Sequence, residues 1–130
     1  MGLFRKRSRE EREEEGNLLA LYDEMKAIVG SVREARLSGS DEIFLRALRS
    51  AVENAPRIVE DVRNLPETMS DKRWLKARRC CEDGFELYIS GCRHTIRWLE
   101  TGDEVELGEG MKEVNVAADL VNEARHLLGR

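Results

Sequence analysis

The sequence predicts an all-α protein, an up-down-up-down antiparallel four-helix bundle with a charged, mobile N-terminal tail. Three observations lead to this prediction. Apolar residues make up 41% of the 130 residues and recur at steps of three and four, the period of an amphipathic helix. Aromatic residues are scarce at 5%, and the chain has only two prolines, which suits helices better than sheets. The expected helices have similar lengths and short connections, so sequence neighbours should pack antiparallel.

The first 15 residues differ from the rest of the chain. Residues 1–15, MGLFRKRSREEREEE, run from a short apolar start through basic to acidic residues, and they have little apolar surface to bury. We expect them to form the tail, with helix as an alternative near its end, and residues 16–130 to form the helical domain. The first helix is expected to start at Leu18 after an Asn17 N-cap and to end at the LSGS segment, 37–40. Its apolar stripe consists of Leu18, Leu21, Met25, Ile28, Val32 and Ala35.

A second helix is expected from Asp41 to the segment LPETMSD at 65–71. Pro56 lies inside it and should kink it, because proline lacks a backbone donor and clashes with the preceding turn. The apolar period continues through the proline, which argues against two unrelated helices. The stripe consists of Leu45, Leu48, Val52, Ala55, Val59 and Val62.

The third helix is expected over 72–101 and the fourth from about residue 104. Gly102 fits the position that ends a helix, and Asp103 can cap the next one. The stripe of the third helix is Trp74, Cys81, Phe85, Tyr88, Cys92, Thr95 and Leu99. The stripe of the fourth is Leu107, Met111, Val114, Ala118, Val121, Ala124 and Leu128.

A second row of small and apolar residues lies beside the main stripe of the third helix. Glycine inside a helix costs about 1 kcal/mol relative to alanine, so Gly84 and Gly91 indicate a backbone that approaches closely. The neighbour is either another helix of the same bundle or the equivalent helix of a second subunit, and the sequence leaves both open. We predict that this row forms the seam of a homodimer or docks a protein partner, with Leu87 and Trp98 as anchors. The predicted seam consists of Cys80, Gly84, Leu87, Gly91 and Trp98.

The three cysteines are not expected to bind a metal. Cys80 and Cys81 point roughly 100° apart on a helix, and Cys92 lies roughly 16 Å along the axis from Cys81. Cys80 is the one candidate for a reactive thiol, because Arg78 and Arg79 beside it could lower its pKa. An odd number of cysteines, two of them adjacent, favours the reducing cytoplasm over a disulfide framework.

No enzyme site or cofactor is expected either. Glu123 and His126 have the Glu-x-x-His spacing of a di-iron bundle, but it occurs once, and both His94 and His126 are expected to face solvent. No glycine-rich phosphate loop is present, and the expected core has no polar cluster for acid–base chemistry. The leading prediction is therefore a non-catalytic interaction or assembly module.

Two basic clusters support an alternative function, which is binding to nucleic acid or to an anionic membrane surface. One is RKRSR at 5–9, and the other, KRWLKARR at 72–79, contains Lys72, Arg73, Lys76 and Arg79. The net charge of −4 and the lack of a base-reading motif favour the simpler interpretation that these residues only solvate a helix surface. No apolar run approaches the length of a transmembrane helix.

Overall fold

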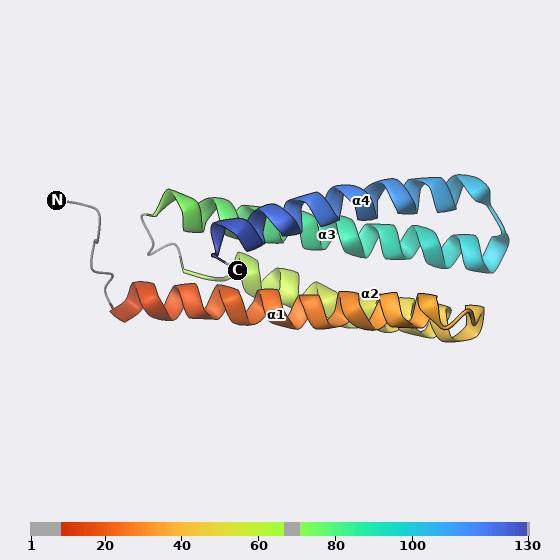
Figure 1. Cartoon of the computed structure of the whole chain (residues 1–130), viewed down its shortest axis with the longest axis horizontal. Helices are drawn as coiled ribbons and strands as arrows, with labels where there is room; N and C mark the ends of the chain where they lie inside the picture. The colour runs from red at the N-terminus through yellow and green to blue at the C-terminus, as the bar shows by residue number, and fades with distance from the viewer. Residues whose placement is uncertain (1–8, 67–70, 130) are drawn as a thin grey trace.

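The structure, a computed structural model, describes residues 9–66 and 71–129. These residues form four helices and contain no strand: α1 (Arg9–Leu37), α2 (Asp41–Arg63), α3 (Lys72–Thr101) and α4 (Glu104–Leu127). Figure 1 shows an elongated molecule in which each helix returns beside the one before it. The prediction of an all-α chain with four helices is confirmed over these residues. Residues 1–8, which belong to the expected tail, lie outside them.

Short polar side chains define where the helices begin. The N–H group of Ile43 donates to Ser40 Oγ (3.3 Å), and that of Val105 donates to Asp103 Oδ1 (3.0 Å). Asp71 caps α3 in the same way. At the end of α3, Gly102 has a φ of 75°, and its N–H group donates to the carbonyl of Trp98 (2.7 Å). A positive φ favours glycine there, so the predicted roles of Gly102 and Asp103 are confirmed.

Helix α1 begins at Arg9, earlier than the predicted start at Leu18. Asn17 therefore lies inside the helix and does not cap it. The added turns are rich in glutamate and arginine, which are good helix formers, and Arg9 and Glu13 form an i,i+4 ion pair (3.4 Å). Charged residues without an apolar stripe thus extend the helix into the segment expected to be a tail.

Helix α2 continues through Pro56. Buried residues lie on both sides of the proline, with Ala55 before it and Ile58 and Val59 after it. The apolar face is therefore continuous, as the sequence period indicates, and Pro56 itself is exposed. The kink expected at this position stays a prediction.

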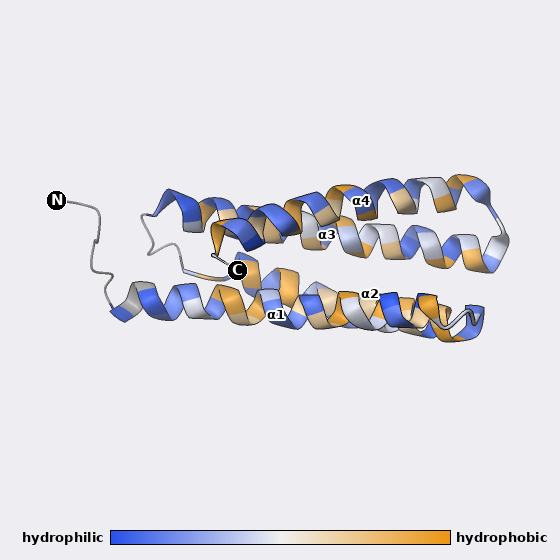
Figure 2. Cartoon of the chain, viewed as in Figure 1, coloured by the Kyte–Doolittle hydropathy of each residue, from blue (hydrophilic) through white to orange (hydrophobic). Residues whose placement is uncertain are grey.

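Helices α1, α2 and α3 surround the main hydrophobic core. The side chains at its centre are less than 2% exposed: Phe85, Leu18, Met25, Ile58, Val62, Cys81 and Cys92. The main stripe predicted for the third helix is confirmed from Trp74 to Cys92, because every member in that span is buried. Figure 2 shows that each helix carries both hydrophobic and hydrophilic residues along its length, as amphipathic helices do.

Ion pairs on the surface join helices that lie next to each other. Arg57 of α2 reaches Glu24 of α1 (2.8 Å), and Arg49 of α2 reaches Glu100 of α3 (2.7 Å). Arg63, at the end of α2, pairs with Glu82 (2.8 Å). Exposed pairs of this kind contribute little stability, roughly 0–1 kcal/mol each, so they serve mainly to favour one register.

Among the described helices, α3 is the one whose backbone lies close to that of α4. No Cα atom of α4 lies within 8 Å of a Cα atom of α1 or α2. Figure 1 shows α3 between α4 and the pair of α1 and α2. Helix α3 is therefore covered on two sides, and the contacts that hold α4 must come from α3. In the described parts of the chain, no helix combines the length and apolarity needed to cross a membrane.

Candidate interaction surface on helices α3 and α4

The contact between α3 and α4 is built from small residues spaced seven apart on each helix. All of them are buried. A Cβ atom added to Gly91 would lie 3.1 Å from the carbonyl oxygen of Gly110, and one added to Gly84 would lie 3.4 Å from that of Ala117. The backbones therefore approach closely in an antiparallel register. We call these six residues the small-residue seam: Ala77, Gly84 and Gly91 of α3, and Gly110, Ala117 and Ala124 of α4.

The small-residue seam shows which helix lies close to the backbone at the two glycines of α3. Gly84 and Gly91 face α4 of the same chain, which is one of the two arrangements the sequence leaves open. Cys80 is also buried, with 7% of its surface exposed. The other two residues of the predicted interaction seam, Leu87 and Trp98, are only partly buried. Only these two anchors keep surface that another molecule could reach.

The predicted apolar stripe of the fourth helix is wrong in part. Met111 is 58% exposed and Ala118 is exposed, although both were expected to face the core. Among the residues of α4, those that are buried are Gly110, Ala117 and Ala124. Helix α4 is rotated about its own axis relative to the predicted orientation, because its small residues pack against the glycines of α3. This packing lets the two backbones approach more closely than larger side chains would allow.

A partly exposed apolar surface lies along one flank of the small-residue seam. On α3, Leu87 and the core residue Tyr88 project on opposite sides of the seam, because consecutive residues of a helix point about 100° apart. Two ion pairs cross the seam on the same side as Leu87, His94–Glu113 (3.3 Å) and Lys76–Glu123 (3.1 Å). By helical phase, four apolar residues of this flank form what we call the outer α3–α4 face: Val116, and Leu87, Leu120 and Leu127, which are partly buried and also pack against the core.

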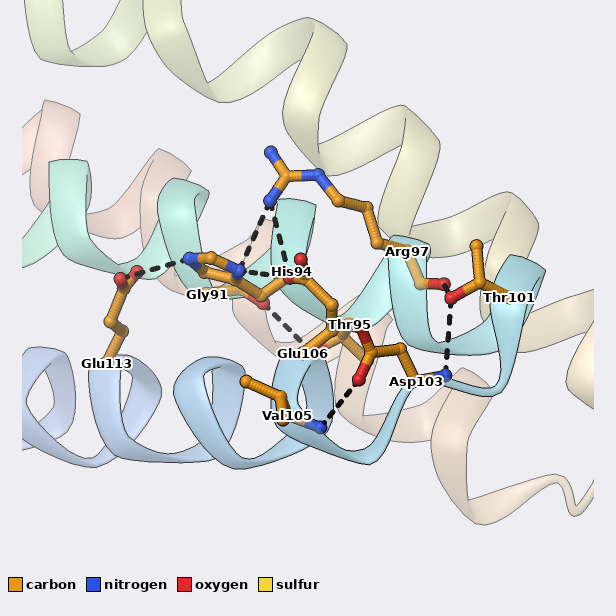
Figure 3. A network of polar contacts seen from close by, with 9 residues as sticks. All are labelled: Gly91, His94, Thr95, Arg97, Thr101, Asp103, Val105, Glu106 and Glu113. Atoms are coloured by element: carbon orange, nitrogen blue, oxygen red, sulfur yellow. Dashed lines mark hydrogen bonds and ion pairs between the residues drawn. The ribbon is translucent and has the colours of Figure 1, made fainter.

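His94 lies in a polar network that joins the two helices near their connection (Figure 3). Its Nδ1 atom contacts the carboxylate of Glu106, and its Nε2 atom lies 3.3 Å from Glu113 Oε1. Arg97 Nη1 lies 3.2 Å from His94 Nδ1 and 3.4 Å from Glu106 Oε2. The hydrogen bond to His94 is the main cause that lowers the pKa of Glu106, and the charge of Arg97 acts in the same direction.

This network corrects the expectation that both histidines face solvent. The side chain of His94 is only 23% exposed, whereas His126 is exposed, as predicted. Sequence reasoning missed the network because its members come from two helices whose register was not known. One signal was available, since Glu106 and Glu113 are seven residues apart and so share one face of α4. Both ring nitrogens of His94 have partners, so the ring acts as a link between helices.

The basic cluster at 72–79 is exposed, but parts of it are engaged by α4. Lys76 pairs with Glu123 (3.1 Å), and Arg73 Nη2 donates to the carbonyl of His126 (3.4 Å). Among the described residues, Lys72 and Arg79 have no ion-pair or side-chain hydrogen-bond partner. The cluster therefore presents less free positive charge than its sequence suggests.

The candidate role of Cys80 as a reactive thiol gains no support from its surroundings, although the charge of Arg79 does act to lower its pKa. Burial raises the pKa of the Cys80 thiol, and the charge of Glu123 raises it further. Burial also raises the pKa of Cys81 to about 12 and that of Cys92 to about 11. The three thiols are free, and in the described parts of the chain no three His, Cys, Asp or Glu side chains are grouped as metal ligands would be.

Comparisons with models of known protein families, with curated proteins and with solved structures find no match to this chain. Function must therefore be argued from the geometry of its own residues. That geometry offers one partly exposed apolar surface on α3 and α4, and one polar link between the same two helices.

Proposed function

We propose that the chain is a non-catalytic assembly module, an up-down-up-down antiparallel bundle that forms a homodimer through the outer α3–α4 face. The observation that carries this proposal is the row of apolar side chains that keeps solvent exposure after the helices have packed. Val116 is 45% exposed near the middle of α4, and Leu87 is partly exposed beside it on α3. The surface differs from the predicted seam, since only Leu87 belongs to both.

Charge along this face supports a second copy of the chain as the partner. The start of α3, residues 72–79, carries five basic residues and no acidic one. Arg78 donates to carbonyl groups of α2, and Arg73 and Lys76 are engaged by α4. Lys72 and Arg79 therefore supply the free positive charge at this end. The first turns of α4, residues 104–113, carry four glutamates and one lysine. Because α3 and α4 are antiparallel, these segments lie at opposite ends of the face. A two-fold axis near Leu87 would place the basic end of one copy on the acidic end of the other.

The proposal includes a cytoplasmic location. Three free thiols in one small domain persist best in a reducing compartment. The competing proposal is binding of nucleic acid or an anionic membrane surface through Lys72, Arg73, Lys76 and Arg79, together with the basic arm at 5–9. It is less well supported, because two of the four residues on α3 are engaged by α4.

Mass measurements on matched variants test the proposal. Wild-type protein should shift from monomer to dimer as concentration rises from the micromolar to the millimolar range, in light scattering coupled to gel filtration. Val116→Glu should stay a folded monomer, because a charge at the interface would be unpaired. Leu37→Glu is the control, since Leu37 is 68% exposed at the α1–α2 connection, far along the sequence from the face.

Three results would contradict the proposal. These are a wild type that stays monomeric at every concentration, a Val116→Glu variant that dimerises like wild type, and a Leu37→Glu variant that loses the dimer equally. Binding of a nucleic acid or of anionic vesicles at low salt, lost on replacing the four basic residues with glutamine, would favour the competing proposal. Such binding weakens steeply with salt, whereas apolar docking changes little.

A further inference from the structure

The number of hydrogen-bond donors on His94 depends on its charge. A neutral imidazole has one N–H group and one acceptor nitrogen, whereas an imidazolium has two N–H groups. In this structure each ring nitrogen meets a carboxylate, Glu106 on one side and Glu113 on the other. An ionised carboxylate only accepts hydrogen bonds. Both contacts can therefore be hydrogen bonds only when the ring is positively charged.

The charged groups around His94 are few. Helix α4 contributes Glu106 and Glu113, and α3 itself contributes Arg97. Helices α1 and α2 pack on the other side of α3, as Figure 1 shows, and contribute no ion pair to this ring. Arg97 opposes the charge on the ring, and its Nη1 atom can donate to a neutral Nδ1 (3.2 Å). When the ring loses its proton, only one of the two carboxylates still receives a hydrogen bond from it, and Glu106 also has a longer contact with Arg97 (3.4 Å).

We propose that His94 is a pH-dependent clamp that holds the first half of α4 on α3 when the ring is charged and loosens it when the ring is neutral. The charged ring makes two contacts with α4, and the neutral ring can donate to only one carboxylate. The clamp is therefore strongest when the ring is charged, at low pH, and weakest when the ring is neutral, at high pH. Histidine charge changes between about pH 5 and 8, where glutamates stay ionised.

Loosening this contact should affect how the start of α4 is held, because α4 lies at one side of the molecule. No Cα atom of α1 or α2 comes within 8 Å of α4, so contacts with α3 must hold it. Its first turns contain Gly108, which weakens a helix, and the exposed Val105 and Met111, which contribute little burial. The small-residue seam begins only at Gly110. The His94 network thus joins the first three turns of α4 to α3 through Glu106 and Glu113, beside the partly buried Leu107.

Amide hydrogen exchange measured at pH 5.5 and pH 8.0 tests the clamp in the full chain. After correction for intrinsic exchange rates, protection of residues 106–114 should fall by about 5- to 10-fold at the higher pH, the scale of a lost charged hydrogen bond that is partly exposed. Amides of α2 serve as the internal reference, because α2 does not contact the network. Protein concentration is kept constant, and the clamp does not depend on self-association.

Two variants and one control make the test specific. His94→Gln cannot change its charge, and Glu113→Gln lets a neutral ring satisfy both neighbours, so both should remove the pH dependence in α4. His126→Gln should keep it, because His126 lies exposed in the last turn of the helix. The proposal is overturned if wild-type α4 shows the same protection relative to α2 at both pH values, or if His94→Gln retains the wild-type change.

Discussion

At the scale of single residues, glycines decide how closely α3 and α4 approach. A Cβ atom at Gly91 would lie 2.7 Å from Val114 Cγ2 and 3.1 Å from the carbonyl of Gly110, so the opposing backbone would have to move. At Gly84 the nearest atom would be Leu120 Cβ at 3.1 Å, which requires a smaller shift. Around Gly30 there is open space. The same change to alanine therefore has a different effect at each position.

The first prediction compares these substitutions. Gly91→Ala should lower the free energy of unfolding by up to about 2 kcal/mol, because overpacking costs about 1–3 kcal/mol and the gain in helix propensity offsets about 1. Gly84→Ala should be close to neutral. Gly30→Ala should raise stability by up to about 1 kcal/mol, since only the propensity gain applies. Urea denaturation measures all three, and an equal effect at positions 91 and 30 would contradict the close approach.

The second prediction concerns the thiols. Because burial raises the pKa of all three cysteines, to about 12 at Cys81 and about 11 at Cys92, very little thiolate forms near neutral pH. In native protein at pH 8, Cys81 and Cys92 should react with a disulfide reagent at least about 100-fold more slowly than in unfolded protein. Cys80 should react first, because 7% of it is exposed. A thiol that reacts at the unfolded rate at pH 7 would show that the site is activated.

At the scale of helices, the sequence predicts the core faces of α1, α2 and α3 well and the contact face of α4 poorly. The first three helices bury large apolar side chains, such as Met25, Ile58 and Phe85, so their period marks the buried face. Helix α4 instead buries glycine and alanine, which carry almost no hydrophobic signal. The spacing of Glu106 and Glu113 hinted at a shared face, but the His94 network could not be predicted, because it depends on which residue of α4 lies opposite Gly91.

The third prediction follows from the lowered pKa of Glu106. A carboxylate whose pKa is lower in the folded state stabilises the fold above its unfolded pKa, about 4.3 for glutamate, and loses this effect as pH falls through the folded value. Glu106→Gln should therefore destabilise the chain most near pH 6, and the difference from wild type should shrink toward pH 2. Glu109→Gln, at an exposed position on the same helix, is the control. A difference that stays constant with pH would argue against the pairing with His94.

At the scale of the whole molecule, α3 is the central element. Its main stripe packs on α1 and α2, and its second row packs on α4, which explains why apolar and small residues cover so much of its surface. The breadth of that surface was visible in the sequence, but it could not distinguish an internal neighbour from a second subunit. Once α4 covers the glycines, apolar surface remains on the outer α3–α4 face, where Val116 is 45% exposed, and we propose that self-association uses this face.

Disulfide formation at the proposed two-fold axis tests this assignment most directly. Val116 lies near the middle of α4, close to the axis, so a cysteine there would meet its copy in the second chain within the reach of a disulfide bond. Val116→Cys should form a covalent dimer under mild oxidation much faster than Leu37→Cys, whose side chain is more exposed but lies outside the face. Equal rates for the two variants, or faster dimer formation by Leu37→Cys, would contradict self-association through the outer α3–α4 face.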